Sequence, residues 1–358
     1  MKKLSIHLPA SQSHEYPIFV GVNLIEKIET LFEFSNYSKL LVITDETVAP
    51  LFLDKLQKNL PSKTETITLP TGEKAKDIEY LTKIWEKMID AQLDRKSLVI
   101  NLGGGVIGDI GGFAASTYMR GIDFINIPTT LLAQVDESVG GKTMIDFHGI
   151  KNIVGTFHQP SAVIIDVATL QTLPERQLLN GFAEIIKHGL VKDKTYFDLV
   201  RSKKPKDFSH EELLEIIVRS NEIKSEIIQE DEKESGLRKV VNYGHTLGHA
   251  VEVLSLVTQN PLLHGEAVSI GMVAENNIAV ETGLLSNEDA DVIKKTLENA
   301  GLPVKVPDFE TDEILEKMKL DKKNTDGKIN FTLLKTLGEG IINQTVSEEI
   351  IKKTLNKS

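Results

Sequence analysis

The stretch that decides the fold is S-L-V-I-N-L-G-G-G-V-I-G-D-I-G-G-F-A-A-S, residues 97–116. Its first six residues form an apolar run typical of a strand buried in a parallel sheet. Gly103, Gly105 and Gly108 then satisfy G-x-G-x-x-G where a helix is predicted to begin. Glycine lets the backbone approach a pyrophosphate, and the helix N-terminus offers unpaired N–H groups. The order predicts a nucleotide-binding loop, although a glycine-rich turn packed on the sheet has the same pattern.

Further strands are predicted on both sides of this loop, at residues 4–8, 18–20, 39–44, 64–69, 124–127 and 163–165, with a helix at 78–93. Strands separated by helices indicate a parallel sheet. Residues 175–319 show long helical periods, followed by a hairpin at 328–334 and 341–346 and a last helix. We therefore predict a Rossmann-like α/β nucleotide-binding domain at residues 1–175 and a mainly α-helical, metal-binding domain at 176–358.

The loop departs from the ordinary dinucleotide pattern in one respect. No acidic residue ends the next strand, which runs instead into Pro128, Thr129 and Thr130. Asp45 ends an earlier predicted strand and is the alternative partner for the ribose hydroxyls.

The composition limits the classes of function. The 358 residues carry a formal charge of −11, which disfavours binding to nucleic acid or anionic lipid. The chain has no cysteine, and its first residues lack the apolar segment of a signal peptide. No apolar run approaches the ~20 residues that span a bilayer. We expect a cytoplasmic protein with neither a nucleic-acid nor a membrane partner.

Histidines gather in V-N-Y-G-H-T-L-G-H-A, residues 241–250, and L-L-H-G-E-A-V, residues 262–268. His245 and His249 are four residues apart and share a helix face, with Asn242 expected one turn earlier. His264 follows at a predicted helix start, and Glu184 lies in G-F-A-E-I-I-K-H-G. A carboxylate and several imidazoles favour a divalent metal site. The competing interpretation is that the paired histidines only cap or pack their helix.

Basic residues stand out in a chain that is acidic overall. A cluster of them would indicate a bound phosphate or carboxylate, although each one alone also fits an ordinary surface position. The candidates are Arg120, Lys142, Lys151, Lys187, Lys224, Arg238, Lys322 and Lys323. With the nucleotide loop and the metal site, they predict redox chemistry on a phosphorylated, hydroxylated substrate.

Several longer motifs occur in order along the chain, and through them it closely resembles the 3-dehydroquinate synthase family of sugar phosphate cyclases. They are G-G-G-V-I-G-D, P-T-T-L-L-A-Q-V-D-E-S-V-G-G-K-T, K-N-I-V-G-T-F-H-Q-P, G-F-A-E-I-I-K, D-E-K-E-S-G-L-R, N-Y-G-H-T-L-G-H-A, L-H-G-E-A-V and D-K-K. The resemblance implies conversion of 3-deoxy-D-arabino-heptulosonate 7-phosphate to 3-dehydroquinate and phosphate in the shikimate pathway. It also implies transient oxidation by NAD, phosphate elimination, re-reduction, ring opening and an intramolecular aldol closure, with zinc or cobalt as the metal.

The resemblance assigns roles by position. Glu184, His245 and His264 match metal ligands, and His249 matches a proton relay. Substrate contacts match Lys142, Asn152, Lys187, Lys224, Arg238, Asn242 and either Lys322 or Lys323, with Asp136 and Glu234 orienting these groups. Arg120 matches a residue that reaches the phosphate from the partner subunit, which implies a homodimer. The NAD contacts match Asp45, Glu73, Lys76, Gly104, Gly105, Val106, Asp109, Thr129, Thr130, Lys142, Lys151, Thr172 and Leu173.

Three alternatives stay open at this point. Other sugar phosphate cyclases, such as 2-deoxy-scyllo-inosose and valiolone-type synthases, share the cofactors, although Arg238 and Asn242 favour a substrate with a carboxylate. A polyol dehydrogenase of the glycerol dehydrogenase type would release NADH. An inactive metal- or nucleotide-binding module would not need the full set of polar site residues.

Overall fold

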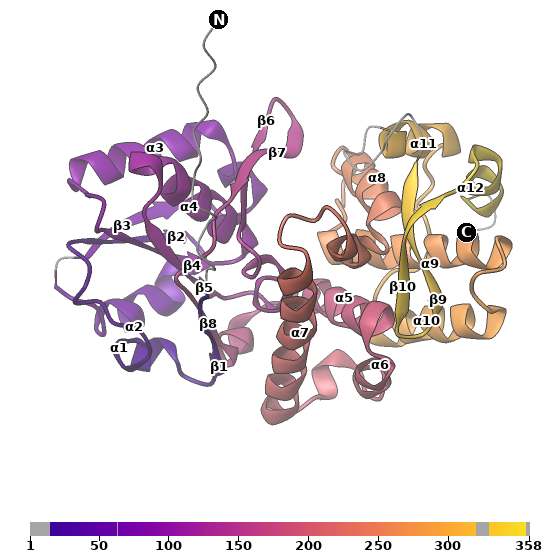
Figure 1. Cartoon of the computed structure of the whole chain (residues 1–358), viewed down its shortest axis with the longest axis horizontal. Coiled ribbons are helices and arrows are strands. Elements are labelled where there is room, and N and C mark those ends of the chain that lie inside the picture. Colours follow the sequence, from indigo (N-terminus) through magenta and orange to yellow (C-terminus); the bar gives the residue numbers. More distant parts are fainter. Residues whose placement is uncertain (1–14, 63, 320–328, 356–358) are drawn as a thin grey trace, which may run out of the picture.

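A computed structural model describes residues 15–62, 64–319 and 329–355. Its first part is built on one parallel sheet of six strands (Figure 1). In spatial order these are β1 (Ile18–Gly21), β8 (Ala162–Asp166), β5 (Asp123–Pro128), β4 (Leu98–Gly103), β2 (Leu40–Asp45) and β3 (Thr64–Leu69). The predicted parallel sheet is confirmed, whereas the strand predicted at residues 4–8 lies outside the described residues.

Successive residues of the central strands enter two different hydrophobic clusters because side chains alternate across a sheet. Leu41 and Val99 pack on one face with α3 (Ile78–Asp90) and α4 (Gly105–Thr117). The other face packs against the short helices α1 (Ile28–Leu31) and α2 (Asp54–Gln57). The only tryptophan of the chain, Trp85, lies on α3, and its Nε1 donates to the Ala114 carbonyl of α4 at 3.4 Å.

An antiparallel hairpin was not predicted. It consists of β6 (Lys142–Phe147) and β7 (Ile150–Phe157), packs against α4 and extends beyond the helices around it (Figure 1). Several apolar side chains on β7 are exposed, including Ile150 and Phe157. The hairpin places Lys142 and Lys151 beside the second half of the molecule, where they pair with Glu234 and Glu252.

The second half is mainly helical, as predicted (Figure 1). Its helices are α5 (Glu175–Lys192), α6 (Lys194–Val200), α7 (His210–Glu230), α8 (His245–Ser255), α9 (His264–Glu281), α10 (Asn287–Ala300), α11 (Thr311–Lys319) and α12 (Glu348–Leu355). The predicted late hairpin is β9 (Asn330–Thr336) and β10 (Glu339–Thr345). A division near residue 175 stays a prediction, and it is compatible with β8 ending at Asp166 and α5 beginning at Glu175. Within the described residues, no helix has both the length and the apolar character needed to cross a membrane.

Glycines bring α8 and α9 unusually close together. A methyl group at Gly271 of α9 would overlap the carbonyl oxygen of Gly244, and one at Gly248 would touch the Ala267 carbonyl at 3.0 Å. Gly244 itself has φ +79°, a left-handed conformation that favours glycine. At the start of α9, a methyl group at Gly265 would overlap the backbone of Asn180 in α5. The beginnings of α8 and α9 are therefore held tightly against the middle of α5.

Candidate active site

The closely packed helices bring the predicted metal ligands together. Glu184 lies in the middle of α5, while His245 and His264 are the first residues of α8 and α9. The Nε2 atoms of His245 and His264 lie 3.8 and 3.6 Å from Glu184 Oε1. The other nitrogen of each ring is also hydrogen-bonded. Nδ1 of His245 lies 3.1 Å from the Tyr243 carbonyl oxygen, and Nδ1 of His264 lies 3.2 Å from Glu252 Oε2. Two nitrogens therefore converge on one carboxylate oxygen.

The chemistry of these donors fits a divalent cation. The Glu184 side chain is fully buried, yet its oxygens accept no hydrogen bond of normal geometry from any residue that the structure describes. Its Oε2 does form an ion pair with Lys187 Nζ. Burial lowers the pKa of His264, but Glu184 and Glu252 outweigh it and raise the value to about 10. A site that draws a proton so strongly attracts positive charge, and its nitrogen and oxygen donors suit zinc or cobalt.

His249 is an alternative third ligand. Donor atoms of His245, His249 and His264 all lie within 4.8 Å of one another. The His249 ring centroid is 5.1 Å from that of His245 and 5.7 Å from that of His264. The predicted shared helix face of His245 and His249 is confirmed. The prediction that Asn242 continues this helix is wrong, because it ends a separate 3₁₀ helix (Leu237–Asn242) and the left-handed Gly244 intervenes.

Beside this cluster lies a group of cations, each with a partner. Lys224 Nζ is 2.7 Å from Asp136 Oδ1, and Lys142 forms an ion pair with Glu234. Asn242 Nδ2 donates to the other Glu234 oxygen at 2.5 Å. Burial raises the pKa of Asp136, but Lys224 and Lys187 outweigh it and hold the value well below its usual range. The predicted placement of Asp136 and Glu234 beside Lys224, Lys142 and Asn242 is thus present in the geometry, and the roles of these residues toward a substrate stay predictions.

Arg238 is almost completely buried. Its Nη1 donates to the Glu232 carbonyl at 2.5 Å and to the Gly140 carbonyl at 3.4 Å. A methyl group at Gly140 would overlap the guanidinium, so glycine at this position leaves room for the arginine. Two backbone carbonyls therefore position the guanidinium where α7 and the glycine turn before β6 meet.

Two residues of the site were missed by sequence reasoning. Glu252 accepts a hydrogen bond from Lys151 Nζ at 2.8 Å and contacts His264 through its other oxygen. Its position three residues after His249 and seven after His245 could have indicated a shared helix face. His188 is buried between Ser220 Oγ, 2.7 Å from Nδ1, and Asp136 Oδ1, 3.5 Å from Nε2. His188 is four residues after Glu184, and this spacing could likewise have indicated a shared helix face.

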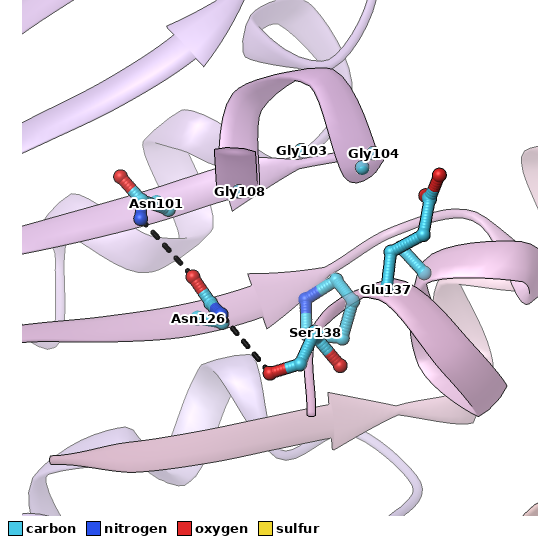
Figure 2. Close-up of a pocket in the computed structure, with 10 residues that line it drawn as sticks. Asn101, Gly103, Gly104, Gly108, Asn126, Glu137 and Ser138 are labelled. Atoms are coloured by element: carbon cyan, nitrogen blue, oxygen red, sulfur yellow. Dashed lines mark hydrogen bonds between the residues drawn. The ribbon is translucent and has the colours of Figure 1, made fainter. Parts of the chain in front are cut away.

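The predicted nucleotide loop has the expected geometry. Strand β4 ends at Gly103, Gly104 is the N-cap, and α4 begins at Gly105. A pocket beside it is lined by Asn101, Gly103, Gly104, Gly105, Gly108, Asn126, Pro128, Ala133, Glu137 and Ser138. Figure 2 shows the polar wall of this pocket, where Asn101 Nδ2 donates to Asn126 Oδ1 at 3.0 Å and Asn126 Nδ2 donates to the Ser138 carbonyl at 3.2 Å.

Other residues predicted to contact the nucleotide lie on several different elements. Lys76 and Asp109 form a buried ion pair at 2.5 Å. Asp45 ends β2, as predicted, and accepts hydrogen bonds from the N–H groups of Thr47 and Val48 at 2.8 and 3.0 Å. Val106 is in the first turn of α4, and Thr129 and Thr130 follow β5. Thr172 ends a 3₁₀ helix (Val167–Thr172), and Leu173 is its C-cap residue. Glu73 Oε1 lies 3.9 Å from Lys151 Nζ.

A few predicted site residues are not brought into the cluster. Arg120 is exposed, with φ +74°, at the end of a short 3₁₀ helix (Tyr118–Arg120). Asn152 is exposed on β7, and its N–H donates to Asp146 Oδ1 at 2.7 Å. Lys322 and Lys323 lie outside the described residues.

Two solved structures that superpose closely on this chain belong to one class of enzymes. The 2-epi-5-epi-valiolone synthase of Streptomyces hygroscopicus subsp. jinggangensis, solved with NAD⁺ and Zn²⁺, superposes with a TM-score of 0.87 at 30% identity, covering 98% of this chain and 99% of that one. A 2-deoxy-scyllo-inosose synthase solved with carbaglucose-6-phosphate, NAD⁺ and Co²⁺ gives 0.86 at 25% identity, covering 95% and 96%. The architecture is that of the sugar phosphate cyclases.

The sequence then selects one family within this class. Residues 66–180 match the family 3-dehydroquinate synthase N-terminal, and residues 181–324 match 3-dehydroquinate synthase C-terminal. A 3-dehydroquinate synthase of Ruminiclostridium cellulolyticum is 43% identical over 349 residues, covering 96% of each chain. This chain belongs to the 3-dehydroquinate synthase family. The predictions of an enzyme, a lyase, and a place in the shikimate pathway are confirmed.

Proposed function

We propose that this chain forms 3-dehydroquinate and phosphate from 3-deoxy-D-arabino-heptulosonate 7-phosphate with one NAD and one divalent ion per site. The main support for this proposal is that His245 and His264 converge on the buried carboxylate of Glu184, which also pairs with Lys187. The contact of Lys151 with Glu252 joins this cluster to the nucleotide domain. The pairing of nitrogen and carboxylate donors with neighbouring cations suits a hydroxylated substrate that carries anionic groups.

Each group that the reaction needs has residues that would hold it. Glu184, His245 and His264 would bind the metal ion, and Gly104, Gly105 and Asp45 would hold the pyrophosphate and ribose of NAD. When bound, NAD supplies a hydride acceptor that is regenerated in each turnover, and the metal ion supplies Lewis acidity toward the hydroxyl that is oxidised.

The chain's own side chains would orient the substrate and handle protons. Lys142, Lys224 and Arg238 supply positive charge against the substrate's carboxylate and phosphate, although the whole chain carries −11. His249, within 5.7 Å of His264 between ring centroids, would move a proton at the substrate hydroxyls. The departing phosphate would take the C6 proton itself, so no side chain is assigned to that step.

The functional unit would be a homodimer in the cytoplasm. Arg120 is exposed on its own chain, which supports the proposal that it reaches the substrate phosphate of the partner subunit. A two-fold axis would then give two equivalent composite sites.

The test is a product assay with a catalytic amount of NAD. The purified enzyme, loaded with zinc or cobalt, should release phosphate through many turnovers and yield 3-dehydroquinate identified by mass spectrometry. Chelation should stop the reaction, and added zinc or cobalt should restore it. Stoichiometric accumulation of NADH would identify a dehydrogenase instead, and full activity of metal-free His264→Ala would exclude the proposed metal site.

A further inference from the structure

Glu137 is a carboxylate that the proposed chemistry does not use, and it lies against the nucleotide loop. It ends the helical turn Ala133–Glu137 and lines the same pocket as Gly104 and Gly105. Figure 2 shows its side chain extending to the level of Gly104. A methyl group at Gly105 would overlap both the carboxyl carbon and an oxygen of Glu137. The carboxyl group is therefore in contact with the first residue of α4.

In the proposed nucleotide site, a bound pyrophosphate would approach this same position. The N-terminus of α4 offers unpaired N–H groups and the positive end of the helix dipole, both of which attract an anion. A pyrophosphate approaching Gly104 and Gly105 would meet the Glu137 carboxylate at van der Waals distance. Two anions in contact repel each other, so only one of them occupies the loop while both are charged.

The charged groups facing Glu137 do not neutralise it fully. Asp109 of α4 and the adjacent Asp136 are negative, whereas Lys76 and, without a bound metal ion, His264 are positive. Lys76 is already paired with Asp109 at 2.5 Å. Burial, and then Asp109, raise the pKa of Glu137 to about 7, although Lys76 and His264 lower it. The carboxyl group therefore changes charge near neutral pH.

We propose that Glu137 competes with the NAD pyrophosphate for the glycine loop, so that NAD binds only when this carboxyl group is neutral or turned away. This inference rests on the proposed nucleotide site and adds Glu137 as a residue that sets the affinity of that site for NAD. A residue that weakens binding of the oxidised nucleotide also gives the protein a proton-linked affinity, because protonated Glu137 admits the pyrophosphate and ionised Glu137 opposes it.

The test is calorimetric titration of NAD into the zinc-loaded enzyme at pH 6 and pH 8. Because ionised Glu137 opposes the pyrophosphate, the wild type should bind NAD several-fold more weakly at pH 8 than at pH 6. Glu137→Gln and Glu137→Ser should bind with nearly equal affinity at both values, matching or exceeding the wild type at pH 6. Glu79→Gln, which removes an exposed carboxylate from α3 of the same domain, should follow the wild type.

The outcomes separate this inference from the site on which it rests. Absence of NAD binding by the wild type would overturn the nucleotide site and the inference together. NAD binding with one pH-independent affinity, shared by the wild type and both Glu137 variants, would overturn the inference alone. Weaker binding in folded Glu137 variants, checked by circular dichroism, would show that Glu137 assists the nucleotide and would also overturn it. If a variant does not fold, the pH dependence of NAD binding by the wild type alone still tests the inference, and an affinity that is equal at pH 6 and pH 8 would overturn it.

Discussion

At the scale of single residues, Glu252 connects the two halves of the site. One of its oxygens accepts from Lys151 on β7, and the other contacts Nδ1 of His264. Burial raises the pKa of Glu252, but His264 and Lys151 outweigh it and hold the value far below its usual range. The side chain therefore stays ionised and keeps His264 turned with Nε2 toward Glu184.

Removal of this charge should weaken metal binding. Glu252→Gln keeps the shape of the side chain but removes the anion that orients His264, and such changes lower metal affinity by roughly 10- to 100-fold. Zinc affinity, measured by competition with a chromogenic chelator, checks this expectation. Glu298→Gln, an exposed carboxylate on α10, is the matched control. Equal zinc affinity in Glu252→Gln and wild type would show that His264 needs no such support.

Asp231 organises the loop that leads to Arg238. Its Oδ1 accepts from the Ser235 N–H at 3.0 Å, and its Oδ2 accepts from the Gly236 and Arg238 N–H groups at 2.7 and 3.1 Å. Burial raises the pKa of Asp231, but these hydrogen bonds outweigh it and lower the value to about 2.

This lowered pKa predicts a pH-dependent contribution to stability. Because the folded pKa is below the unfolded value of about 3.9, the carboxylate stabilises the fold above that pH and loses its effect as the pH falls toward about 2. Asp231→Asn should reduce the free energy of unfolding by about 1 kcal/mol at pH 7, after allowance for solvent screening. Urea denaturation should show this deficit shrinking between pH 5 and pH 3. A deficit that stays constant over that range would contradict the assignment.

The sequence located the site residues that carry their own local signal. His245, His249 and His264 were visible through spacing, and Glu184 through its motif. Glu252 occupies a spacing that a solvated helix face would also show, so pattern alone could not distinguish the two. The contact of Glu137 with Gly105 depends on how the helical turn after β5 folds back on α4, and no local pattern encodes such a tertiary contact.

At the scale of elements, the close approach of α8 and α9 decides where the histidines meet. Gly271→Ala would force a methyl group into the Gly244 carbonyl, which belongs to backbone and cannot turn aside. Overpacking of this kind costs about 2 kcal/mol or more, of which the better helix propensity of alanine offsets about 1. Thermal and urea unfolding should show the loss, together with weaker zinc binding.

The matched control for this change is Gly108→Ala in α4. The nearest atom to a methyl group there is Asn126 Oδ1 at 3.9 Å, so the substitution is accommodated. Its free energy of unfolding should equal or exceed that of the wild type. Wild-type stability and zinc affinity in Gly271→Ala would mean that the two helices can separate without cost to the site.

The elements that sequence reasoning found are those whose burial pattern is strong. The central strands β2, β4 and β8 are buried along their whole length and appear as continuous apolar runs. The hairpin β6–β7 was missed because glycine, lysine and asparagine interrupt its apolar residues and much of β7 is exposed. Such a ribbon is stabilised by packing on α4 and by cross-strand pairing, which appear only when the chain has folded.

At the scale of the whole molecule, the site is assembled from both halves of the chain. Asp136, Lys142 and Lys151 come from the first half and pair with Lys224, Glu234 and Glu252 of the second. Each of these contacts joins opposite charges, so each also holds the two halves together. If these side chains bind the substrate as proposed, ligand binding would be coupled to the contact between the two halves.

The proposed homodimer predicts complementation between inactive variants. Arg120→Ala and Glu184→Gln should each be nearly inactive alone, since each lacks one component of the composite site. In a mixed dimer, one site receives both substitutions and the other receives neither, so mixing followed by subunit exchange should restore up to about a quarter of wild-type activity. Phosphate release measures the recovery, and a mixture of Arg120→Ala with Lys142→Ala should recover similarly. No recovery despite verified exchange would remove the cross-subunit role of Arg120.

The position of Trp85 gives the molecule an internal optical reporter. As the only indole of the chain, it lies on α3 against α4, the helix that begins at the glycine loop. Its fluorescence therefore arises from the α/β half alone, whereas far-ultraviolet circular dichroism is dominated by the helical half. During denaturation, two coincident curves would show that the halves unfold as one cooperative unit, and two separate curves would resolve their individual stabilities without any added label.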